Sequence, residues 1–235
     1  MNDAAHAMDR MYRRQRHLYD ASRKFYLLGR DQTIAELAVP AGGSVLEIGC
    51  GTGRNLVRIA QTYPSAACHG LDVSAAMLDT AARSVARAGL DGRISLARGD
   101  ATAFDPTALF GQDAYDRILI SYALSMIPPW ERVLAEAVGH LAPEGQLHVV
   151  DFGGQAGLPR PARALLNRWL SAFSVTPRVT LPQVVADAAA RTGAEACVRQ
   201  RFGGYCVQAV IVRRTGSGVP AGGGGPPVPD HRPIA

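Results

Sequence analysis

The sequence lacks the features of a secreted, membrane-spanning or zinc-binding protein. Its N-terminus has no apolar stretch of signal-peptide length, and its longest apolar runs, such as Ile118 to Ile127, fall well short of a membrane span. Its cysteines, Cys50, Cys68, Cys197 and Cys206, show neither CxxC nor Cys–His spacing of a zinc site. We therefore expect no metal, cysteines that serve as small core residues in a reducing compartment, and a cytoplasmic protein that is at most peripheral on the inner face of a membrane.

The charge is concentrated in a short part of the chain. The 235 residues are 47% hydrophobic and carry a formal net charge of only +5, as in a soluble globular protein with room for one catalytic domain. Residues 1–30 alone hold seven basic and three acidic side chains. This segment is a candidate surface for lipid head groups or phosphates, although a solvated helix face would have the same composition.

Composition also divides the chain into three parts. Residues 215–235 consist largely of Gly, Pro and Ser, and too little of this segment could be buried to offset the entropy of ordering it. We predict an N-terminal helical cap at residues 1–30, one domain at residues 31–214 and a disordered tail at residues 215–235.

Short β-branched runs alternate with Ala-rich helical runs, which predicts βα units on a parallel sheet. Strands are expected at Ser44–Ile48, Ala66–Leu71, Ile94–Ala97, Tyr115–Ser121 and Gln146–Asp151, and helices at Asn55–Tyr63, Ala75–Ala88 and Trp130–Leu141. Ser74 is the expected N-cap of the second helix, and a turn at Pro143-Glu144-Gly145 should introduce the fifth strand.

The C-terminal part changes character. A helix expected at Pro182–Thr192 is followed by two strand-like runs, Glu195–Arg201 and Tyr205–Arg213, separated by Gly203-Gly204 as in a β-hairpin. A parallel sheet that ends in an antiparallel hairpin resembles the class I methyltransferases, whereas dinucleotide-binding folds usually end in another parallel strand. The resemblance implies a Rossmann-like α/β fold with a mostly parallel seven-stranded sheet.

A glycine-rich turn follows the first strand. Gly49, Gly51 and Gly53 let the backbone turn tightly and approach a ligand closely, although such a turn can also be purely structural. The GxGxG spacing, with Glu47 two residues before it, differs from the GxGxxG that cradles a pyrophosphate and favours S-adenosylmethionine over NAD. In the methyltransferases that it resembles, the acid organises the loop, and Cys50 and the glycines line the path of the cofactor.

Acidic residues follow the next two strands. Asp72 lies about twenty residues after the glycines, where a carboxylate can accept both ribose hydroxyls. The resemblance implies that Val73 and Met77 pack against the adenine ring and that Asp100 accepts from the adenine amino group. Ala101, beside Asp100, and Ser121, at the end of the fourth strand, complete the cofactor set along the same edge. A core role for Met77 and a simple turn role for Asp100 are the alternatives.

The N-terminal region is more particular. Residues 8–20 and 23–31, which include the string Tyr26-Leu27-Leu28-Gly29-Arg30-Asp31, resemble the bacterial N-methyltransferases of betaine-lipid synthesis. That family converts diacylglyceryl-homoserine to diacylglyceryl-trimethylhomoserine, and the likeness covers residues 1 to 214. It implies three successive methylations, with S-adenosylhomocysteine as by-product, an amine-bearing glycerolipid substrate, an anionic membrane surface and an aminocarboxypropyl transferase that hands over the substrate.

Tyr12, Tyr19 and Tyr26 recur every seven residues, close to one helix face. Phenol rings can close over a sulfonium or ammonium, and the Arg30 fork can pair with a carboxylate. We assign Tyr12 and Arg30 to the cofactor and Tyr19 and Tyr26 to the substrate amine, although the aromatics could simply pin a covering helix to the domain.

Tyr122 and Ser125 follow the fourth strand and are expected to face the substrate pocket. We count Tyr122 with Tyr19 and Tyr26 as catalytic, and His148 and Asp151 as further candidates to accept a proton. No Asp/Asn-Pro-Pro-aromatic motif occupies this strand end, because Pro128-Pro129-Trp130 lies too far downstream. We therefore expect no nucleic-acid partner.

An insertion at residues 152–181 contains apolar residues at helical spacing, including Trp169, flanked by Arg160, Arg163 and Arg168. Such a helix is typical of a bilayer interface, but a lid packed on the core has the same pattern. Three other functions remain open: a phosphatidylethanolamine N-methyltransferase, an NAD-dependent oxidoreductase and a non-catalytic adenosylmethionine-binding protein.

Overall fold

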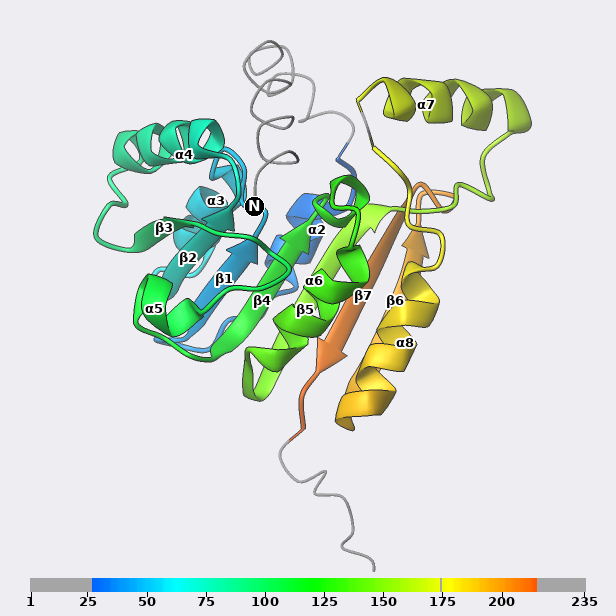
Figure 1. Cartoon of the computed structure of the whole chain (residues 1–235). Helices are drawn as coiled ribbons and strands as arrows, with labels where there is room; N and C mark the ends of the chain where they lie inside the picture. The colour runs from blue at the N-terminus through cyan, green and yellow to red at the C-terminus, as the bar shows by residue number, and fades with distance from the viewer. Residues whose placement is uncertain (1–26, 174, 215–235) are drawn as a thin grey trace, which may run out of the picture.

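The computed structural model describes residues 27–173 and 175–214, which form a seven-stranded sheet with helices on both faces (Figure 1). The strands are β1 (Ser44–Ile48), β2 (Ala67–Asp72), β3 (Ile94–Arg98), β4 (Tyr115–Ser121), β5 (Leu141–Phe152), β6 (Glu195–Arg201) and β7 (Cys206–Val212). Their order is β3-β2-β1-β4-β5-β7-β6, parallel from β3 to β5, with β7 antiparallel to β5 and β6. The predicted fold class, including the terminal hairpin, is confirmed.

Helices connect the strands. They are α2 (Arg30–Ala35), α3 (Arg54–Thr62), α4 (Ala75–Arg87), α5 (Pro106–Phe110), the 3-10 turn η1 (Leu124–Met126), α6 (Trp130–Gly139), α7 (Arg160–Ala172) and α8 (Leu181–Thr192). Ser74 caps α4 as predicted, because its side chain accepts the backbone N–H of Met77 at 3.4 Å. The short helices α2 and α5 were not predicted, and the domain boundary proposed after residue 30 falls just inside α2.

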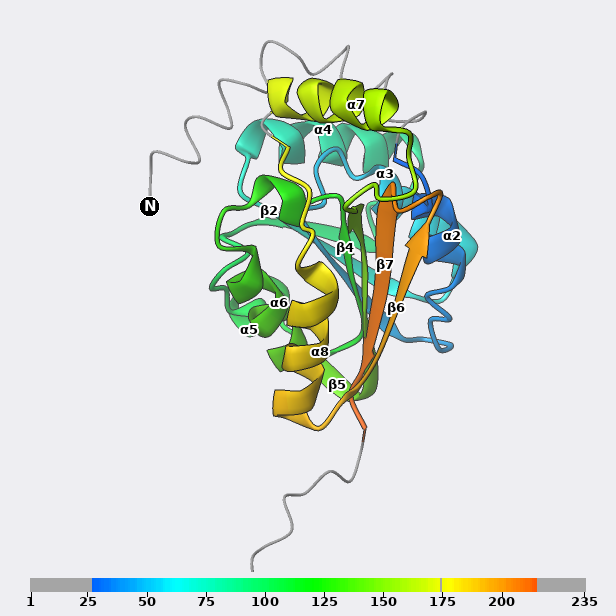
Figure 2. The same ribbon diagram turned by 90° about the vertical axis from the view of Figure 1, so that its right-hand side faces the viewer.

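Two apolar clusters fill the two faces of the sheet. Leu46 and Ile48 of β1 pack with α6 and α8 on one face. Val45 of the same strand packs with α2 and α3 on the other face, because side chains alternate between the two faces of a strand. Figure 2 shows these helix pairs on opposite sides of the sheet. All five residues of β1 are buried, as expected for a central parallel strand. The cores leave the carboxyl ends of the central strands as the edge where a ligand can bind.

Two sequence predictions are wrong in detail. The residues Pro143-Glu144-Gly145 do not precede the fifth strand but lie inside β5, where the register with β4 shifts and Glu144 has φ 59°. Cys197 is exposed, unlike the other three cysteines, because it lies on the edge strand β6, whose side chains are largely exposed.

The helix α7 stands above the carboxyl edge of the sheet (Figures 1 and 2). Leu170 is its buried residue, and it joins a third cluster with Tyr122, Phe152 and Cys206. The inner side of α7 is therefore a cover packed on the domain, as one of the two interpretations predicted. Across residues 27–173 and 175–214, no helix is long and apolar enough to cross a membrane.

Candidate cofactor and acceptor site

A cavity of about 510 Å³ opens at the carboxyl ends of β1, β2 and β4. The chain leaves β1 toward β2 on one side and returns to β4 on the other, so this is the point where the strand order reverses. The predicted cofactor residues that line it are Arg30, Glu47, Gly49, Cys50, Gly51, Asp72, Val73, Met77, Asp100, Ala101 and Ser121. The fold thus gathers at one cavity residues that are spread over 92 positions of the chain, from 30 to 121.

The glycine loop folds tightly over the end of β2. The amides of Gly49 and Cys50 both donate to the carbonyl of Leu71, at 2.8 and 3.0 Å. Gly49 has φ 73°, and a Cβ there would lie 2.6 Å from the Cβ of Ala123. Only glycine fits this backbone without strain, and the first glycine is therefore required by the path of the loop itself.

Asp72 joins the loop to β2. One carboxylate oxygen accepts the backbone N–H of Gly51 at 2.8 Å, and the other accepts the N–H of Ser74 at 2.9 Å. These contacts orient Asp72 at the cavity, and each carboxylate oxygen can accept more than one hydrogen bond. Asp72 can therefore hold both the loop and a ribose.

Glu47 is buried at the end of β1, with 1% of its surface exposed. The amide of Asn55, in the first turn of α3, donates to it at 2.6 Å. This bond spans the glycine loop and links the strand to the helix that follows. The organising role that the resemblance implied for Glu47 agrees with this geometry.

Asp100 follows β3 and lines the cavity. Its carboxylate accepts from the backbone N–H of Thr102 at 2.9 Å and from the Thr102 hydroxyl at 2.7 Å. Met77 is 4% exposed and reaches the cavity from the first turn of α4. A carboxylate and an apolar side chain are the groups that an adenine ring with its amino group requires.

Gly53 does not line the cavity. It is the N-cap of α3 at φ 73°, and a Cβ there would lie 3.0 Å from the Cβ of Ala81. Its place is explained by close packing between α3 and α4. Tyr12, Tyr19 and Tyr26 lie outside the described residues, so their assigned roles stay predictions.

Tyr122 is among the residues that line the cavity, but its hydroxyl is engaged elsewhere. The hydroxyl donates to the carbonyl of Leu28 at 2.5 Å, and burial raises the pKa of Tyr122 well above its usual value. The residue also has φ 54°, a strained backbone conformation for a tyrosine. The geometry fits an aromatic wall and a fastening point for the segment before α2, and it argues against Tyr122 as a proton acceptor.

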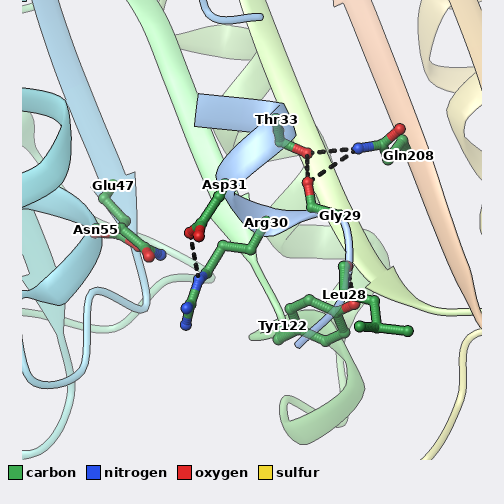
Figure 3. A network of polar contacts seen from close by, with 9 residues as sticks. All are labelled: Leu28, Gly29, Arg30, Asp31, Thr33, Glu47, Asn55, Tyr122 and Gln208. Atoms are coloured by element: carbon green, nitrogen blue, oxygen red, sulfur yellow. Dashed lines mark hydrogen bonds and ion pairs between the residues drawn. The ribbon is translucent and has the colours of Figure 1, made fainter. Parts of the chain in front are cut away.

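A network at the start of α2 brings Arg30 to the cavity (Figure 3). The Gln208 side chain donates to the carbonyl of Gly29 at 3.1 Å and to the Thr33 hydroxyl at 2.9 Å. Arg30 is 5% exposed, and its Nε lies 3.5 Å from the Asp31 carboxylate. Burial, with the nearby positive charge of Arg54, lowers the pKa of Arg30. An anionic group in the cavity would relieve this charge crowding.

His148 and Asp151 lie on β5 and are not among the residues that line the cavity. Burial raises the pKa of Asp151 to about 6, while the backbone N–H groups of Phe152 and Ser125 bond to its two oxygens. Burial and the charge of Arg117 lower the pKa of His148 to about 4. Ser125, buried beside Asp151, does not line the cavity either. The expectation that Ser125 faces the substrate pocket is not met, whereas the roles of His148 and Asp151 as proton acceptors stay predictions.

Sequence reasoning missed one wall of the cavity. Thr80, Ser84 and Arg87 line it from α4, and their spacing of four and three residues places them on one helix face. That polar stripe was a readable signal. The apolar wall at residues 126–129 had no such signal, because it depends on how η1 turns back over the sheet.

Residues 45–145 match the protein family described as "Methyltransferase domain". This match coincides with the strands and loops that build the cavity, and the fold adds the terminal hairpin. Over these residues the chain matches a methyltransferase domain, and its fold is shared by a solved S-adenosylmethionine-dependent methyltransferase. The cofactor that this match supports is S-adenosylmethionine rather than NAD.

Curated relatives that the chain resembles are methyltransferases. The chain is 29% identical over 166 residues to the demethylmenaquinone methyltransferase of Lactobacillus johnsonii. The aligned region covers 68% of this chain and 64% of that protein. The chain is also 29% identical over 137 residues to methyltransferase GfsG of Streptomyces halstedii, covering 58% and 48%. The chain thus spans less than two thirds of the length of these relatives.

Solved structures share the fold of the methyltransferase domain. A SAM-dependent methyltransferase from Aquifex aeolicus aligns with a TM-score of 0.62 at 18% identity, over 91% of this chain and all of that one. The YcgJ protein from Bacillus subtilis aligns with a TM-score of 0.63 at 15% identity, over 80% and 99%.

The donor set of the cavity fits S-adenosylmethionine. Asp72 offers a fixed carboxylate for ribose hydroxyls, Asp100 one for the adenine amino group, and Met77 an apolar surface for the ring. Arg30 is the buried cation that suits the cofactor's carboxylate, and Gly49 keeps the loop free of a side chain. Among residues 27–173 and 175–214, no three His, Cys, Asp or Glu side chains gather as a metal would require.

Proposed function

We propose that this protein is an N-methyltransferase that methylates the amine of diacylglyceryl-homoserine three times and yields diacylglyceryl-N,N,N-trimethylhomoserine. One observation carries the proposal. Leu27 and Arg30 both line the cavity. They belong to the string that resembles betaine-lipid N-methyltransferases, so the described end of that string lies at the site. This contact supports the proposal, because it puts two residues of that string at the cavity where an acceptor would meet the cofactor.

The chain contributes mainly alignment. Bound S-adenosylmethionine supplies an electrophilic methyl group, which an amine can take by in-line displacement without a protein nucleophile. Asp72, Asp100 and Arg30 would hold the cofactor by its ribose, adenine and carboxylate, and a fixed orientation can supply most of the acceleration. Ile127 and Pro128 form an apolar wall of the cavity, which we assign to the acceptor side, where it would exclude water.

The acceptor amine needs a site that tolerates its primary, secondary and tertiary forms. Tyr122 lines the cavity, and we propose that its ring, with those of Tyr19 and Tyr26, forms the aromatic walls around the amine. Aromatic faces attract an ammonium in each methylation state without a fixed number of hydrogen bonds. A single cavity can then serve three successive steps.

A second candidate is C-methylation of an isoprenoid quinone. It is favoured by the similarity to demethylmenaquinone methyltransferases and by the same apolar wall. Phosphatidylethanolamine is the remaining amine substrate. All three acceptors are membrane lipids, so each candidate fits a location on the inner face of the cytoplasmic membrane. An aminocarboxypropyl transferase partner belongs to the first proposal alone.

Lipid mass spectrometry in a heterologous host separates these candidates. The chain is expressed with and without an enzyme that forms diacylglyceryl-homoserine, in a host that lacks its own quinone methyltransferase. We expect trimethylated homoserine lipid only when both are present, and none with an Asp72→Ala variant made to the same level. Methylated phosphatidylethanolamine or restored menaquinone, without the betaine lipid, would overturn the proposal in favour of the corresponding candidate.

A further inference from the structure

An apolar and basic surface lies beside the acceptor side of the cavity. Among the large hydrophobic side chains of the described residues, Leu165 is 71% exposed, Val179 65% and Phe202 53%. They belong to α7, to the segment between α7 and α8, and to the β6–β7 turn, and Figures 1 and 2 show these three parts at the same end of the molecule. We call this surface the α7 end.

Backbone hydrogen bonds hold the three parts together. The amides of Gln155 and Gly157, before α7, donate to the carbonyls of Gly204 and Gly203 at 2.8 and 2.9 Å. Val179 packs beside Gly154, since a Cβ on that glycine would lie 3.4 Å from its side chain. The exposed apolar side chains are therefore carried by one connected structure.

The charge of the α7 end has one sign. Residues 152–186 contain four arginines and no acidic residue, and Arg160, Arg163 and Arg168 lie on α7. Arg160 and Arg168 are exposed and Arg163 is partly exposed. Exposed apolar side chains surrounded by arginines complement an anionic bilayer, which accepts the former among its acyl chains and the latter at its head groups.

The α7 end is also continuous with the site. Leu170 of α7 is buried in the same cluster as Tyr122, Met126 and Leu27, and the partly exposed Leu166 and Trp169 pack against it. Tyr122, Met126 and Leu27 line the cavity. A surface seated on a bilayer at α7 would therefore bring the acceptor side of the cavity close to the lipid.

We propose that the α7 end docks this protein on anionic phospholipid bilayers, with Leu165 and Phe202 entering the interface and the arginines of α7 contacting phosphate groups. The inference deepens the proposed function, because it supplies the surface from which a glycerolipid would be taken. It is tested by binding rather than turnover, so the two can fail separately.

The chain contains a built-in probe of this surface. Its two tryptophans differ, since Trp169 lies on α7 whereas Trp130 is 4% exposed in the core. In the full chain with Trp130→Phe, the emission of Trp169 is followed as vesicles of equimolar phosphatidylglycerol and phosphatidylcholine are added. We expect a blue shift and quenching by brominated lipid, absent with pure phosphatidylcholine vesicles and reversed by salt.

Matched variants separate local docking from general attraction. The double variant Arg163→Gln/Arg168→Gln is compared with the double variant Arg58→Gln/Arg191→Gln. The second pair replaces exposed arginines of α3 and of the far end of α8, and it removes the same amount of charge. We expect the first pair to weaken binding about 20-fold, since each basic residue near an anionic surface contributes about fivefold, and the second pair less than about threefold. Leu165→Asn should weaken binding, whereas Leu109→Asn on α5, also exposed, should not.

Equal losses from both arginine pairs would overturn the proposal, because general charge would then explain the attraction. So would vesicle binding without a response from Trp169, or binding that is equally strong on pure phosphatidylcholine. Light scattering that shows self-association through Leu165, with no vesicle binding, would assign the surface to a second copy instead. Unfolding midpoints equal to the parent confirm that the exposed substitutions leave the fold intact.

Discussion

The cofactor side and the acceptor side of the cavity are built in different ways. The first consists of strand ends and a glycine loop fixed by backbone hydrogen bonds, such as Gly51 to Asp72 at 2.8 Å. The second consists of the segment around Leu27, η1 and the cover provided by α7, held by side-chain packing and by the Tyr122 hydroxyl. The contrast suggests that a conserved chemistry needs a rigid frame, whereas substrate choice resides in segments added around it.

The largest expected effect comes from removing the proposed cap. Deleting residues 1–26 should abolish turnover while leaving cofactor binding in place, because the strands that carry Asp72 and Gly49 remain. Activity with the homoserine lipid and calorimetry with S-adenosylmethionine measure the two sides separately. A truncated protein with a near-normal rate would show that Tyr19 and Tyr26 take no part in the reaction.

A single added methyl group should destabilise the glycine loop. Gly49→Ala should lower the free energy of unfolding by about 2 to 4 kcal/mol, since the added Cβ meets Ala123 in a backbone region unfavourable to alanine. Gly42→Ala is the control, because Gly42 has φ 71° but no atom within 4 Å of a Cβ. Equal losses in urea unfolding would mean that backbone strain alone, without the close contact, sets the requirement.

The cofactor side can also be weakened without changing its packing. Asp72→Ala should reduce affinity for S-adenosylmethionine by about 1 to 3 kcal/mol, because two ribose hydroxyls lose a charged acceptor. Asp105→Ala removes a comparable carboxylate that caps α5 outside the cavity, so it should lower stability slightly and leave affinity unchanged. Unchanged affinity in a folded Asp72→Ala protein would remove the ribose assignment.

A smaller effect concerns two buried groups of β5 with opposite responses to pH. The pKa of Asp151 is raised to about 6 in the folded protein, so its contribution to stability is present below its unfolded pKa and is lost as pH rises toward 6. The pKa of His148 is lowered to about 4, so its contribution is present above its unfolded pKa and is lost as pH falls toward 4. Between pH 4 and 6 the two changes oppose each other.

Substituting either residue should reveal how the free energy of unfolding depends on pH through the other one. In Asp151→Asn, the free energy of unfolding should fall by about 2 kcal/mol more steeply than in the parent on acidification from pH 6 to 4. In His148→Gln it should rise by a similar amount relative to the parent over the same window. Parallel curves for both variants and the parent would show that these groups titrate alike in the folded and unfolded chains.

The two sides also differ in how far they follow from the sequence. The bounds of β1, β4 and β6 agree with the predicted strands, because continuous apolar runs and the Gly203-Gly204 turn are local signals. Eleven cofactor residues were found at the cavity for a similar reason, since strand ends of a parallel sheet meet at one edge. Gly53 shares the local pattern but serves helix packing, and no local signal distinguishes the two uses.

The acceptor side depends on long-range contacts that spacing does not encode. The Tyr122 hydroxyl reaches Leu28, 94 positions earlier in the chain, and the Gln208 amide reaches Gly29 across 179 positions. The sequence placed Tyr122 at the substrate pocket without indicating its bond to Leu28, and it assigned no role to Gln208. The short helices α2 and α5 were missed because a five- or six-residue helix has too little periodicity to recognise.

The most direct test of this account is mass spectrometry of a reaction with purified full-length protein, diacylglyceryl-homoserine and excess S-adenosylmethionine. We predict that the lipid gains one, two and finally three methyl groups on its amine, with the trimethylated lipid as the end product. An end point at the monomethyl or dimethyl lipid would contradict the single roomy acceptor site. Methylation of phosphatidylethanolamine or of a quinone, with the homoserine lipid left unchanged, would contradict the substrate itself.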